Sequence, residues 1–168
     1  MIHDPKCEDE KAIVFSQWPE MIELVAEKLK VNSMKYAIAK QFKKGSYNAI
    51  ESFKHSSDLR ILLMPLNLGA EGLDLIVANH IFFLEPLVDT SMEEQALNRC
   101  HRIGQEKIVK IYKYIIEGTI EENIVKLALK NNQNSPNKSS PSKKKGKAGS
   151  DQNDLSITDL KYLLSSEL

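Results

Sequence analysis

Residues 11–31 read Lys11-Ala-Ile-Val-Phe-Ser-Gln-Trp-Pro-Glu-Met-Ile-Glu-Leu-Val-Ala-Glu-Lys-Leu-Lys-Val31, and this stretch indicates the fold. Its apolar run at 12–15 has the length and composition of a buried strand. Pro19 suits the first position of a helix, and Ile22, Val25 and Leu29 then repeat on one helical face. A buried strand that leads directly into an amphipathic helix is typical of an α/β domain with a parallel sheet.

The same alternation continues through the chain. The apolar pattern predicts strands at residues 34–37, 60–64, 81–84 and 108–115, the first of them weak, and a helix at about 47–53. A glycine-containing loop with one helical turn is expected between the strands at 60–64 and 81–84. The predicted fold class is therefore α/β, with a parallel sheet flanked by helices.

Two capping boxes predict where further helices begin. Ser91 and Glu94 suit the start of a helix that runs to near Gly104, and Thr119 and Glu122 suit the start of one that runs to about residue 130. In each box the hydroxyl can accept an N–H bond of the first turn while the glutamate reaches back.

Composition divides the chain into four segments. Residues 1–10 form a lead-in and residues 11–130 a globular domain. Residues 131–154 are rich in Asn, Ser, Pro, Lys and Gly, so they cannot bury enough apolar surface and are expected to form a disordered basic linker. Within it, Pro141-Ser-Lys-Lys-Lys-Gly-Lys147 is a nuclear-import signal, a loose phosphate-binding patch or a solvated run of lysines. Residues 155–168 predict a short amphipathic helix.

Charge, cysteines and hydropathy exclude several classes of protein. Lys and Arg together number 23, as do Asp and Glu, so any DNA contact must depend on local arrangement. Cys7 and Cys100 have no Cys or His at metal-ligand spacing, which argues against a zinc site and a disulfide framework. No apolar run approaches the roughly 18 residues that span a bilayer, and the start has no signal-peptide pattern. We therefore expect an intracellular protein without membrane contact.

Three polar residues at helical spacing carry the strongest functional signal. Gln95, Arg99 and Arg102 are separated by four and three residues, so a helix would project all three from one face. That spacing alone is more typical of a solvated face. The wider string, Gln95-Ala-Leu-Asn-Arg-Cys-His-Arg-Ile-Gly-Gln105, resembles motif VI of superfamily-two helicases in its Swi/Snf form.

The resemblance implies catalytic roles in ATP hydrolysis for these residues. It makes Arg99 and Arg102 arginine fingers, presented across a cleft to a nucleotide that another lobe holds, and it gives Gln95 a part in orienting that site. A planar guanidinium can bind two oxygens of a γ-phosphoryl group at once, which the point charge of a lysine cannot do. His101 lies off this face, and we interpret it as a packing or hydrogen-bonding residue.

A second block resembles motif V of the same family. It reads Ile61-Leu-Leu-Met-Pro-Leu-Asn-Leu-Gly-Ala-Glu-Gly-Leu-Asp-Leu75. The resemblance assigns Gly69, Gly72 and Asp74 to the nucleotide or to the interface between lobes, and Asn67 to DNA, because glycines let the backbone approach phosphate closely. Ala70 replaces a family glycine, Asp74 an asparagine, and Pro65 a serine or threonine, so a hydroxyl contact to the DNA backbone is missing.

A third block, Lys11 to Trp18, resembles motif IV, whose loop in the family touches the tracking DNA strand. This assigns Ser16 and Gln17 to DNA binding, whereas Trp18 is interpreted as a packing residue. The family's glycine-containing segment is not recognisable around residues 34–44. Lys43 and Lys44, with Lys40, are expected to give a local basic contact to phosphate instead.

Together these blocks make residues 11–130 similar to the second RecA-like lobe of a Swi/Snf-type ATPase. Pro65-Leu66, Glu85-Pro86 and the missing glycine segment look closest to the SHPRH group of RING-finger ubiquitin ligases, which carry such a helicase core. The resemblance implies a nuclear, ATP-dependent DNA translocase that acts in chromatin or DNA repair. Its partners would be double-stranded DNA or chromatin, a first RecA-like lobe and, through a RING outside this chain, ubiquitin-conjugating enzymes.

Neither a GxxxxGK[ST] phosphate loop nor a DExH-like box occurs in the chain. The resemblance therefore places ATP and Mg²⁺ mainly on the first lobe, and the chain alone is expected to be inactive. Two alternatives stay open: a degenerate lobe that serves as a docking platform, which Ala70 and Pro65 favour, and the second lobe of an RNA helicase. Against the RNA helicase, Gln95-Ala96 and Gln105-Glu-Lys107 flank the HRIG string in the Swi/Snf manner.

Overall fold

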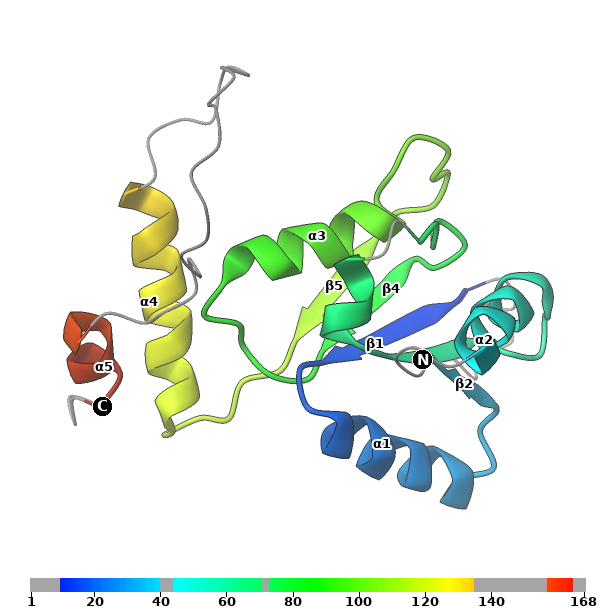
Figure 1. Cartoon of the computed structure of the whole chain (residues 1–168), viewed down its shortest axis with the longest axis horizontal. Coiled ribbons are helices and arrows are strands. Elements are labelled where there is room, and N and C mark those ends of the chain that lie inside the picture. The colour runs from blue at the N-terminus through cyan, green and yellow to red at the C-terminus, as the bar shows by residue number, and fades with distance from the viewer. Residues whose placement is uncertain (1–9, 40–43, 71–72, 135–156, 165–168) are drawn as a thin grey trace. The chain divides into compact units, whose positions relative to one another are not determined.

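The computed structural model describes residues 10–39, 44–70, 73–134 and 157–164. These residues belong to two compact units. The first unit holds a β-sheet and the helices that pack on it, and the second holds two helices near the C-terminus (Figure 1).

The first unit is built on five parallel strands: β1 (Ala12–Ser16), β2 (Tyr36–Ile38), β3 (Ile61–Pro65), β4 (His80–Phe83) and β5 (Lys110–Lys113). Their order across the sheet is β2-β3-β1-β4-β5, so the first strand in sequence is the central one. The crossovers from β2 to β3 and from β4 to β5 join neighbouring strands, whereas those from β1 to β2 and from β3 to β4 each pass over one strand. The predicted α/β fold with a parallel sheet flanked by helices is confirmed.

Helices cover both faces of the sheet. They are α1 (Pro19–Val31), α2 (Lys44–His55) and α3 (Thr90–Cys100), with the 3₁₀ helix η2 (Leu66–Ala70) after β3. Figure 1 shows α1 below the sheet and α3 above it, which is the arrangement that right-handed crossovers require. Between α1 and the sheet, Ile22 and Ala26 of the helix pack against Val14, Ile61 and Leu63 of the strands. The expected helical turn between β3 and β4 is η2.

The weak second strand begins two residues later than predicted because the end of α1 uses the intervening residues. Ser33 has a positive φ of 55°, its N–H donates to the carbonyl of Lys30 at 3.0 Å, and the N–H of Met34 donates to that of Leu29 at 2.9 Å. These two bonds form a Schellman cap, which satisfies orphan carbonyls at the helix end. Met34 therefore belongs to the cap, and pairing starts at Tyr36.

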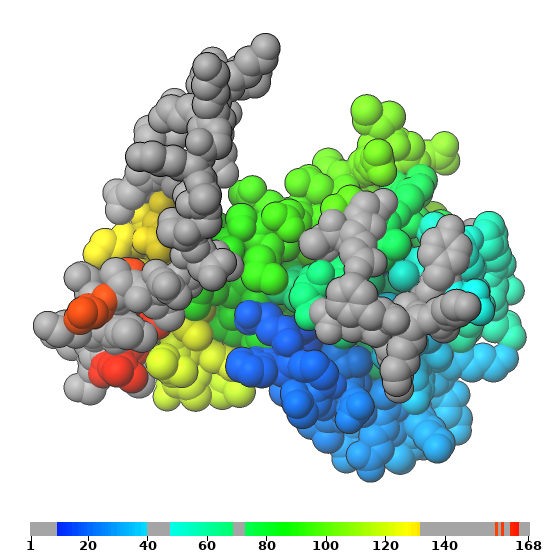
Figure 2. Space-filling model, in the orientation of Figure 1, coloured from blue at the N-terminus to red at the C-terminus, as the bar shows by residue number. Residues whose placement is uncertain are grey.

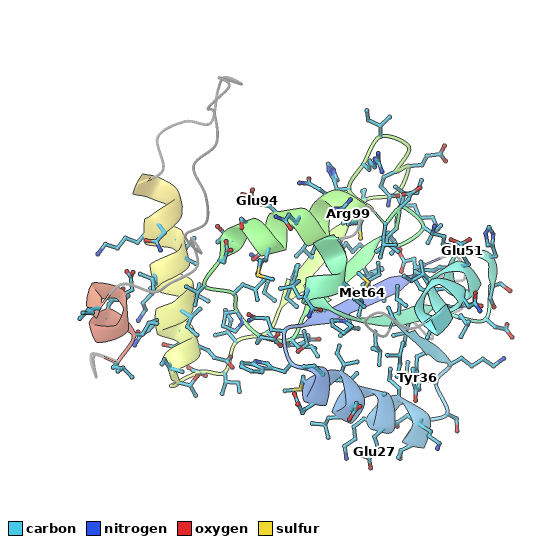
Figure 3. All side chains as sticks on the ribbon, in the orientation of Figure 1. Glu27, Tyr36, Glu51, Met64, Glu94 and Arg99 are labelled. Atoms are coloured by element: carbon cyan, nitrogen blue, oxygen red, sulfur yellow. The ribbon has the colours of Figure 1, made fainter. Side chains whose placement is uncertain are left out.

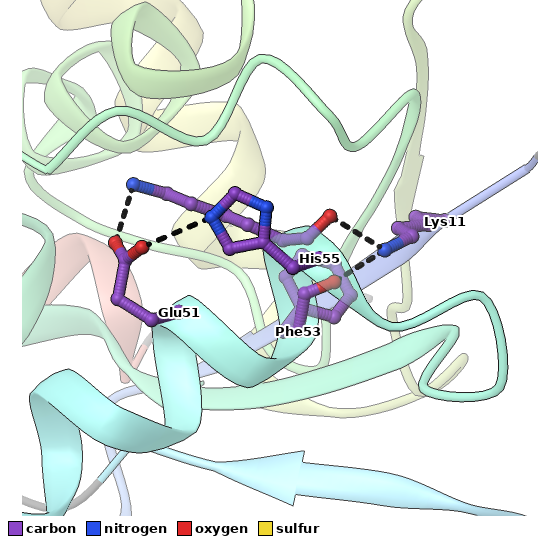
Figure 4. A network of polar contacts seen from close by, with 5 residues as sticks. Lys11, Glu51, Phe53 and His55 are labelled. Atoms are coloured by element: carbon purple, nitrogen blue, oxygen red, sulfur yellow. Dashed lines mark hydrogen bonds and ion pairs between the residues drawn. The ribbon is translucent and has the colours of Figure 1, made fainter.

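Lys11, immediately before β1, closes the C-terminal end of α2 (Figure 4). Its ammonium donates to the carbonyl oxygens of Phe53, Lys54 and Ser56, the last two at 3.1 and 2.9 Å, and lies 5.1 Å from the centre of the Phe53 ring. Burial lowers the pKa of Lys11, and the charge of Lys107 lowers it further. The three carbonyl oxygens act in the opposite direction, because they stabilise the charged form. Lys11 thus supplies the cation that a helix C-terminus favours.

We expect Lys11→Met to lower the free energy of unfolding of the chain by about 1–3 kcal/mol, because it removes hydrogen bonds from a charged donor and leaves half-buried carbonyls unsatisfied. Urea unfolding followed by circular dichroism measures the change. Lys35→Met is the matched control, since Lys35 pairs with Asp58 at 2.6 Å between two exposed side chains. Such a surface pair contributes less than about 1 kcal/mol. Equal losses in the two variants would show that Lys11 does not cap α2.

The second unit contains α4 (Ile120–Asn134) and α5 (Ile157–Leu163). The predicted capping box begins α4: the N–H of Glu121 donates to the Thr119 hydroxyl at 3.2 Å, and the Glu122 carboxylate accepts the N–H of Gly118 at 3.0 Å. The amide of Asn123 donates to the carbonyl of Leu163 at 3.2 Å, which fixes α5 on α4. No helix in the described part of the chain is long and apolar enough to cross a membrane.

The predicted start of the linker at residue 131 is wrong by four residues. Helix α4 continues through Asn134, because an established helix gains one backbone hydrogen bond per added residue without burying that residue. The remainder of the predicted linker, with the 141–147 lysine run, lies outside the described residues. The predicted C-terminal helix is present as α5. The boundaries at residues 10 and 154 stay predictions.

Candidate functional site

The three polar residues of the motif VI string do not share one helix. Helix α3 ends at Cys100, with a last helical bond from the N–H of His101 to the carbonyl of Leu97 at 2.8 Å. The predicted end near Gly104 is therefore wrong. Gln95 is exposed in the middle of α3 and Arg99 is half-buried in its last turn (Figure 3), whereas Arg102 projects from the turn that follows.

That turn, at residues 101–104, is exposed. It belongs to the connection between α3 and β5, which stands out from the surface in light green in Figure 2. Gly104 has a positive φ of 104°, a conformation that side chains with a Cβ rarely adopt. This glycine shapes the turn that follows α3, which has already ended at Cys100. The side chain of Arg102 therefore meets solvent and is free to reach a bound anion.

The carbonyl groups at the end of α3 are satisfied by other parts of the chain. The N–H of Leu75 donates to the carbonyl of Arg99 at 3.0 Å. The side-chain amide of Gln105 donates to Cys100 at 3.2 Å, and the backbone N–H of Gln105 donates to Arg102 at 3.0 Å. The last carbonyls of a helix have no partner within the helix, so these bonds decide where the chain carrying both arginines lies.

Gln105 also fixes residues 74–78, which follow the motif V glycines. Its Nε2 donates to the carbonyl oxygens of Ile76 at 2.7 Å and Ala78 at 3.0 Å, and its Oε1 accepts the N–H of Lys107 at 2.9 Å. The orientation of this amide is unambiguous, because three carbonyl oxygens surround one end and can only accept. The sequence analysis quoted Gln105 within the family string but gave it no role. A terminal amide directly after the turn glycine Gly104 was the signal for it.

Asp74 and Cys100 lie beside this junction. Asp74 is exposed, and its carboxylate accepts the N–H of Ile76 at 3.4 Å. Cys100 is fully buried, and this burial, with a smaller contribution from the Asp74 charge, raises the pKa of its thiol to about 12. The thiol is therefore protonated at neutral pH and is not a nucleophile. Within residues 10–39, 44–70, 73–134 and 157–164, no three His, Cys, Asp or Glu side chains are grouped to hold a metal ion.

The residues predicted to bind DNA lie at the other end of the strands. A helix that joins two parallel strands runs back along the sheet, so α3 ends where strands begin. Ser16, Pro65 and the start of η2 instead follow the carboxyl ends of β1 and β3, which pair in register. Asn67 is exposed there, and Gly69 lies in the same 3₁₀ helix. Met64, just before them, is fully buried (Figure 3). Gly72 lies outside the described residues.

The β1 edge differs from its prediction at two positions. Ser16 is 1% exposed, and its hydroxyl accepts a hydrogen bond from the N–H of Trp18 at 3.0 Å. Its side chain is therefore not accessible to DNA. Its observed role is to shape the turn into α1. Trp18, interpreted as a packing residue, is instead 60% exposed. Gln17 is exposed, with its N–H bonded to the Glu85 carboxylate.

The lysines predicted to contact phosphate are not placed by the structure. Lys40 and Lys43 lie outside the described residues. Lys44 begins α2, and its side chain is likewise not described.

Comparison with known proteins gives the family. A model of the helicase conserved C-terminal domain matches residues 5–104, more than half of the chain. The chain belongs to this helicase C-terminal domain family. Its matched region contains β1 to β4, the motif V segment, α3 and the 101–104 turn.

The helicase C-terminal domain is similar to that of two DNA-repair and ubiquitin-ligase proteins. It is 35% identical over 130 residues to the DNA repair protein rad8 of Schizosaccharomyces pombe, an alignment that covers 74% of this chain and 11% of that protein. It is 36% identical over 133 residues to the human E3 ubiquitin-protein ligase SHPRH, covering 77% of this chain and 8% of SHPRH. The chain thus spans about a tenth of the length of these relatives.

A solved structure gives the same result for the fold. The crystal structure of the C-terminal part of the Fun30 ATPase domain superimposes with a TM-score of 0.68 at 26% identity, covering 71% of this chain and 39% of that one. The predicted resemblance to a Swi/Snf-type helicase lobe of the SHPRH group is confirmed.

Proposed function

We propose that this helicase C-terminal domain acts as the second RecA-like lobe of an ATP-dependent DNA translocase of the Swi/Snf type. The observation that supports this most is the junction at the end of α3. There the motif V and motif VI segments are bonded to each other through Leu75 and Gln105, and together they present Arg99 and Arg102. A solvated helix face would not need the end of its helix to be held by a distant segment.

The chemistry proposed for the two arginines is stabilisation of phosphoryl transfer. ATP supplies a γ-phosphoryl group whose oxygens gain charge as it is transferred, and Mg²⁺ neutralises part of that charge. Arg99 and Arg102 would bind those oxygens with their planar guanidinium groups, and Gln95 would orient them from one turn earlier. The exposed, cationic end of this lobe fits a polyphosphate anion, but the chain has no phosphate loop with which to hold one.

DNA would contact the opposite end of the strands. Gln17, Trp18 and Asn67 are exposed there, and parallel α/β sheets bind ligands at the carboxyl ends of their strands. We add Trp18 to the predicted set because its ring is accessible, and we remove Ser16 because its hydroxyl is not. Lys43 and Lys44 remain proposed phosphate contacts. Because the chain carries no net charge, binding of double-stranded DNA would depend on these local groups.

The cellular setting is proposed from the relatives. Their names describe a DNA repair protein and an E3 ubiquitin-protein ligase. We therefore propose a nuclear protein that acts in DNA repair or chromatin and joins translocation on DNA to ubiquitin transfer. A first RecA-like lobe would bind ATP and Mg²⁺, and a RING domain outside this chain would recruit ubiquitin-conjugating enzymes.

We expect the chain alone to hydrolyse no ATP, and a two-lobe assembly to do so in a DNA-stimulated manner. The two-lobe assembly is this chain together with a first RecA-like lobe that carries the phosphate loop, on one polypeptide or as a second chain. Phosphate release with and without double-stranded DNA measures both. ATP turnover by the chain alone that substitution of Arg102 abolishes would contradict the proposal that a separate first lobe must bind the ATP.

A docking platform is the second candidate function. It is favoured by Pro65, which ends β3 where a family hydroxyl would contact the DNA backbone, and by Ala70 in place of a family glycine. Under this alternative the two-lobe assembly binds its partners but shows no DNA-stimulated turnover. The same phosphate-release measurement therefore separates the two functions.

A further inference from the structure

Gln105 is the residue through which two distant segments of the first unit meet. Its side chain contacts the carbonyl groups of Ile76, Ala78 and Cys100 with one nitrogen, at 2.7, 3.0 and 3.2 Å. An amide nitrogen carries two hydrogens, so at least one of them is shared between two carbonyl oxygens. All the donors of this side chain are used within the protein. Gln105 is therefore not available to bind a nucleotide or DNA itself through that nitrogen.

The three carbonyls belong to two elements that are far apart in the sequence. Ile76 and Ala78 lead into β4, and Cys100 is the last residue of α3. One further bond joins the same elements, from the N–H of Leu75 to the carbonyl of Arg99. Removing the Gln105 amide would thus remove a side chain that bonds both elements, and would leave the carbonyls of Ile76, Ala78 and Cys100 in need of new partners.

We propose that Gln105 is a positioning residue for the arginine pair, and this inference rests on the proposed function of that pair. By holding the Cys100 carbonyl with its side chain and the Arg102 carbonyl with its backbone N–H, Gln105 fixes both ends of the two-residue step from Cys100 to Arg102. Its bonds to Ile76 and Ala78 connect this two-residue step to the segment that leads into β4 of the sheet. Because the bonds at Cys100 and Arg102 hold the turn that follows α3 at its start and its end, the orientation of this turn depends on Gln105.

The first experiment measures the junction in the chain alone, independently of any activity. In Gln105→Ala, hydrogen exchange at the Leu75 amide is expected to accelerate at least about tenfold, because local opening of 74–78 becomes easier. Amides in the β1–β3 ladder are expected to keep their protection. Glu106→Ala is the control, since Glu106 is the exposed neighbour of Gln105. Unchanged exchange at Leu75 would overturn the inference.

The second experiment measures turnover in the two-lobe assembly. Gln105→Ala is expected to lower kcat about ten- to a hundredfold, because misplacing a catalytic group by about 1 Å has effects of that size. KM for ATP is expected to change little, since the arginines act in the transition state. Gln105→Glu keeps the size of the side chain but turns a carboxylate towards three carbonyl oxygens, so it should be at least as harmful. Wild-type kcat in either variant would overturn the inference.

A double-variant cycle separates positioning from general damage. Because Gln105 acts in part through Arg102, Gln105→Ala combined with Arg102→Lys should lose less turnover than the product of the two single losses. Losses that multiply fully would overturn the positioning role. If Arg102→Lys itself keeps normal turnover, the proposed function fails and this inference fails with it. If Arg102→Lys loses turnover and Gln105→Ala does not, only the inference about Gln105 fails. Should Gln105→Ala not fold, Gln105→Asn, with its amide one methylene short, replaces it in the cycle.

Discussion

Arg102→Lys in the two-lobe assembly should lower DNA-stimulated ATP turnover by at least about 10²-fold. Arginine fingers contribute on the order of 10³ to 10⁵ in rate in related phosphoryl-transfer enzymes, and lysine keeps the charge while losing the two-pronged guanidinium contact. Arg102 is exposed on a turn, so its replacement removes no buried packing. The loss should therefore appear in kcat, with ATP and DNA affinities nearly unchanged, because the contact is made chiefly in the transition state.

The position of Arg102 after the helix makes this result easier to interpret. A substitution within α3 changes helix propensity as well as chemistry, whereas one in the 101–104 turn leaves the helix intact. The control is Lys107→Met, which removes a nearby cation from outside the arginine pair and should alter kcat by less than about threefold, as expected for an exposed charge that salt screens. Near-normal turnover in Arg102→Lys would make Arg102 a solvated residue and would favour the docking platform.

Much of the fold could be predicted from short-range patterns. The strands at β1, β3 and β4 are continuous apolar runs because both faces of a parallel sheet are covered, and such runs are visible in the sequence. The ends of elements were less predictable. The start of β2 depends on the left-handed Ser33 in the cap of α1. The end of α3 coincides with hydrogen bonds to its last carbonyls from Leu75 and Gln105, which are contacts that a periodic pattern does not show.

Residues of the candidate site could be predicted where they belong to a family motif. They could not be predicted where a tertiary contact determines their role. Arg99 and Arg102 followed from the motif, but their separation into helix and turn did not. Ser16 and Trp18 exchanged their expected environments, because the Ser16 hydroxyl turns inward to bond the Trp18 N–H. The role of Gln105 required knowing that Ile76 and Ala78, which precede it by 29 and 27 positions, lie against the end of α3.

The second large effect is expected at Phe15, in the central strand. Its ring is fully buried and stacks on that of Phe83 at 5.5 Å between centroids, on the sheet face opposite α1. Phe15→Ala should lower the free energy of unfolding by about 3–5 kcal/mol, since it removes a large apolar side chain and leaves a cavity. Because a domain is stabilised by only about 5–15 kcal/mol, the variant would be close to unfolding at ordinary temperature.

Urea unfolding of the chain tests this, with the slope of the transition checked to be unchanged so that only stability is compared. Phe82→Ala is the matched control: the same residue type, one strand over in β4, half-buried and stacked on Tyr112 at 4.6 Å on the other face of the sheet. Because the Phe82 ring is already partly in water, less apolar area is lost, and we expect a decrease below about 3 kcal/mol. Phe15 lies one residue before Ser16, so its loss should also loosen the turn that exposes Gln17 and Trp18. An equal or larger loss in Phe82→Ala would mean that the core is centred on the β4–β5 side of the sheet, contrary to the burial of β1.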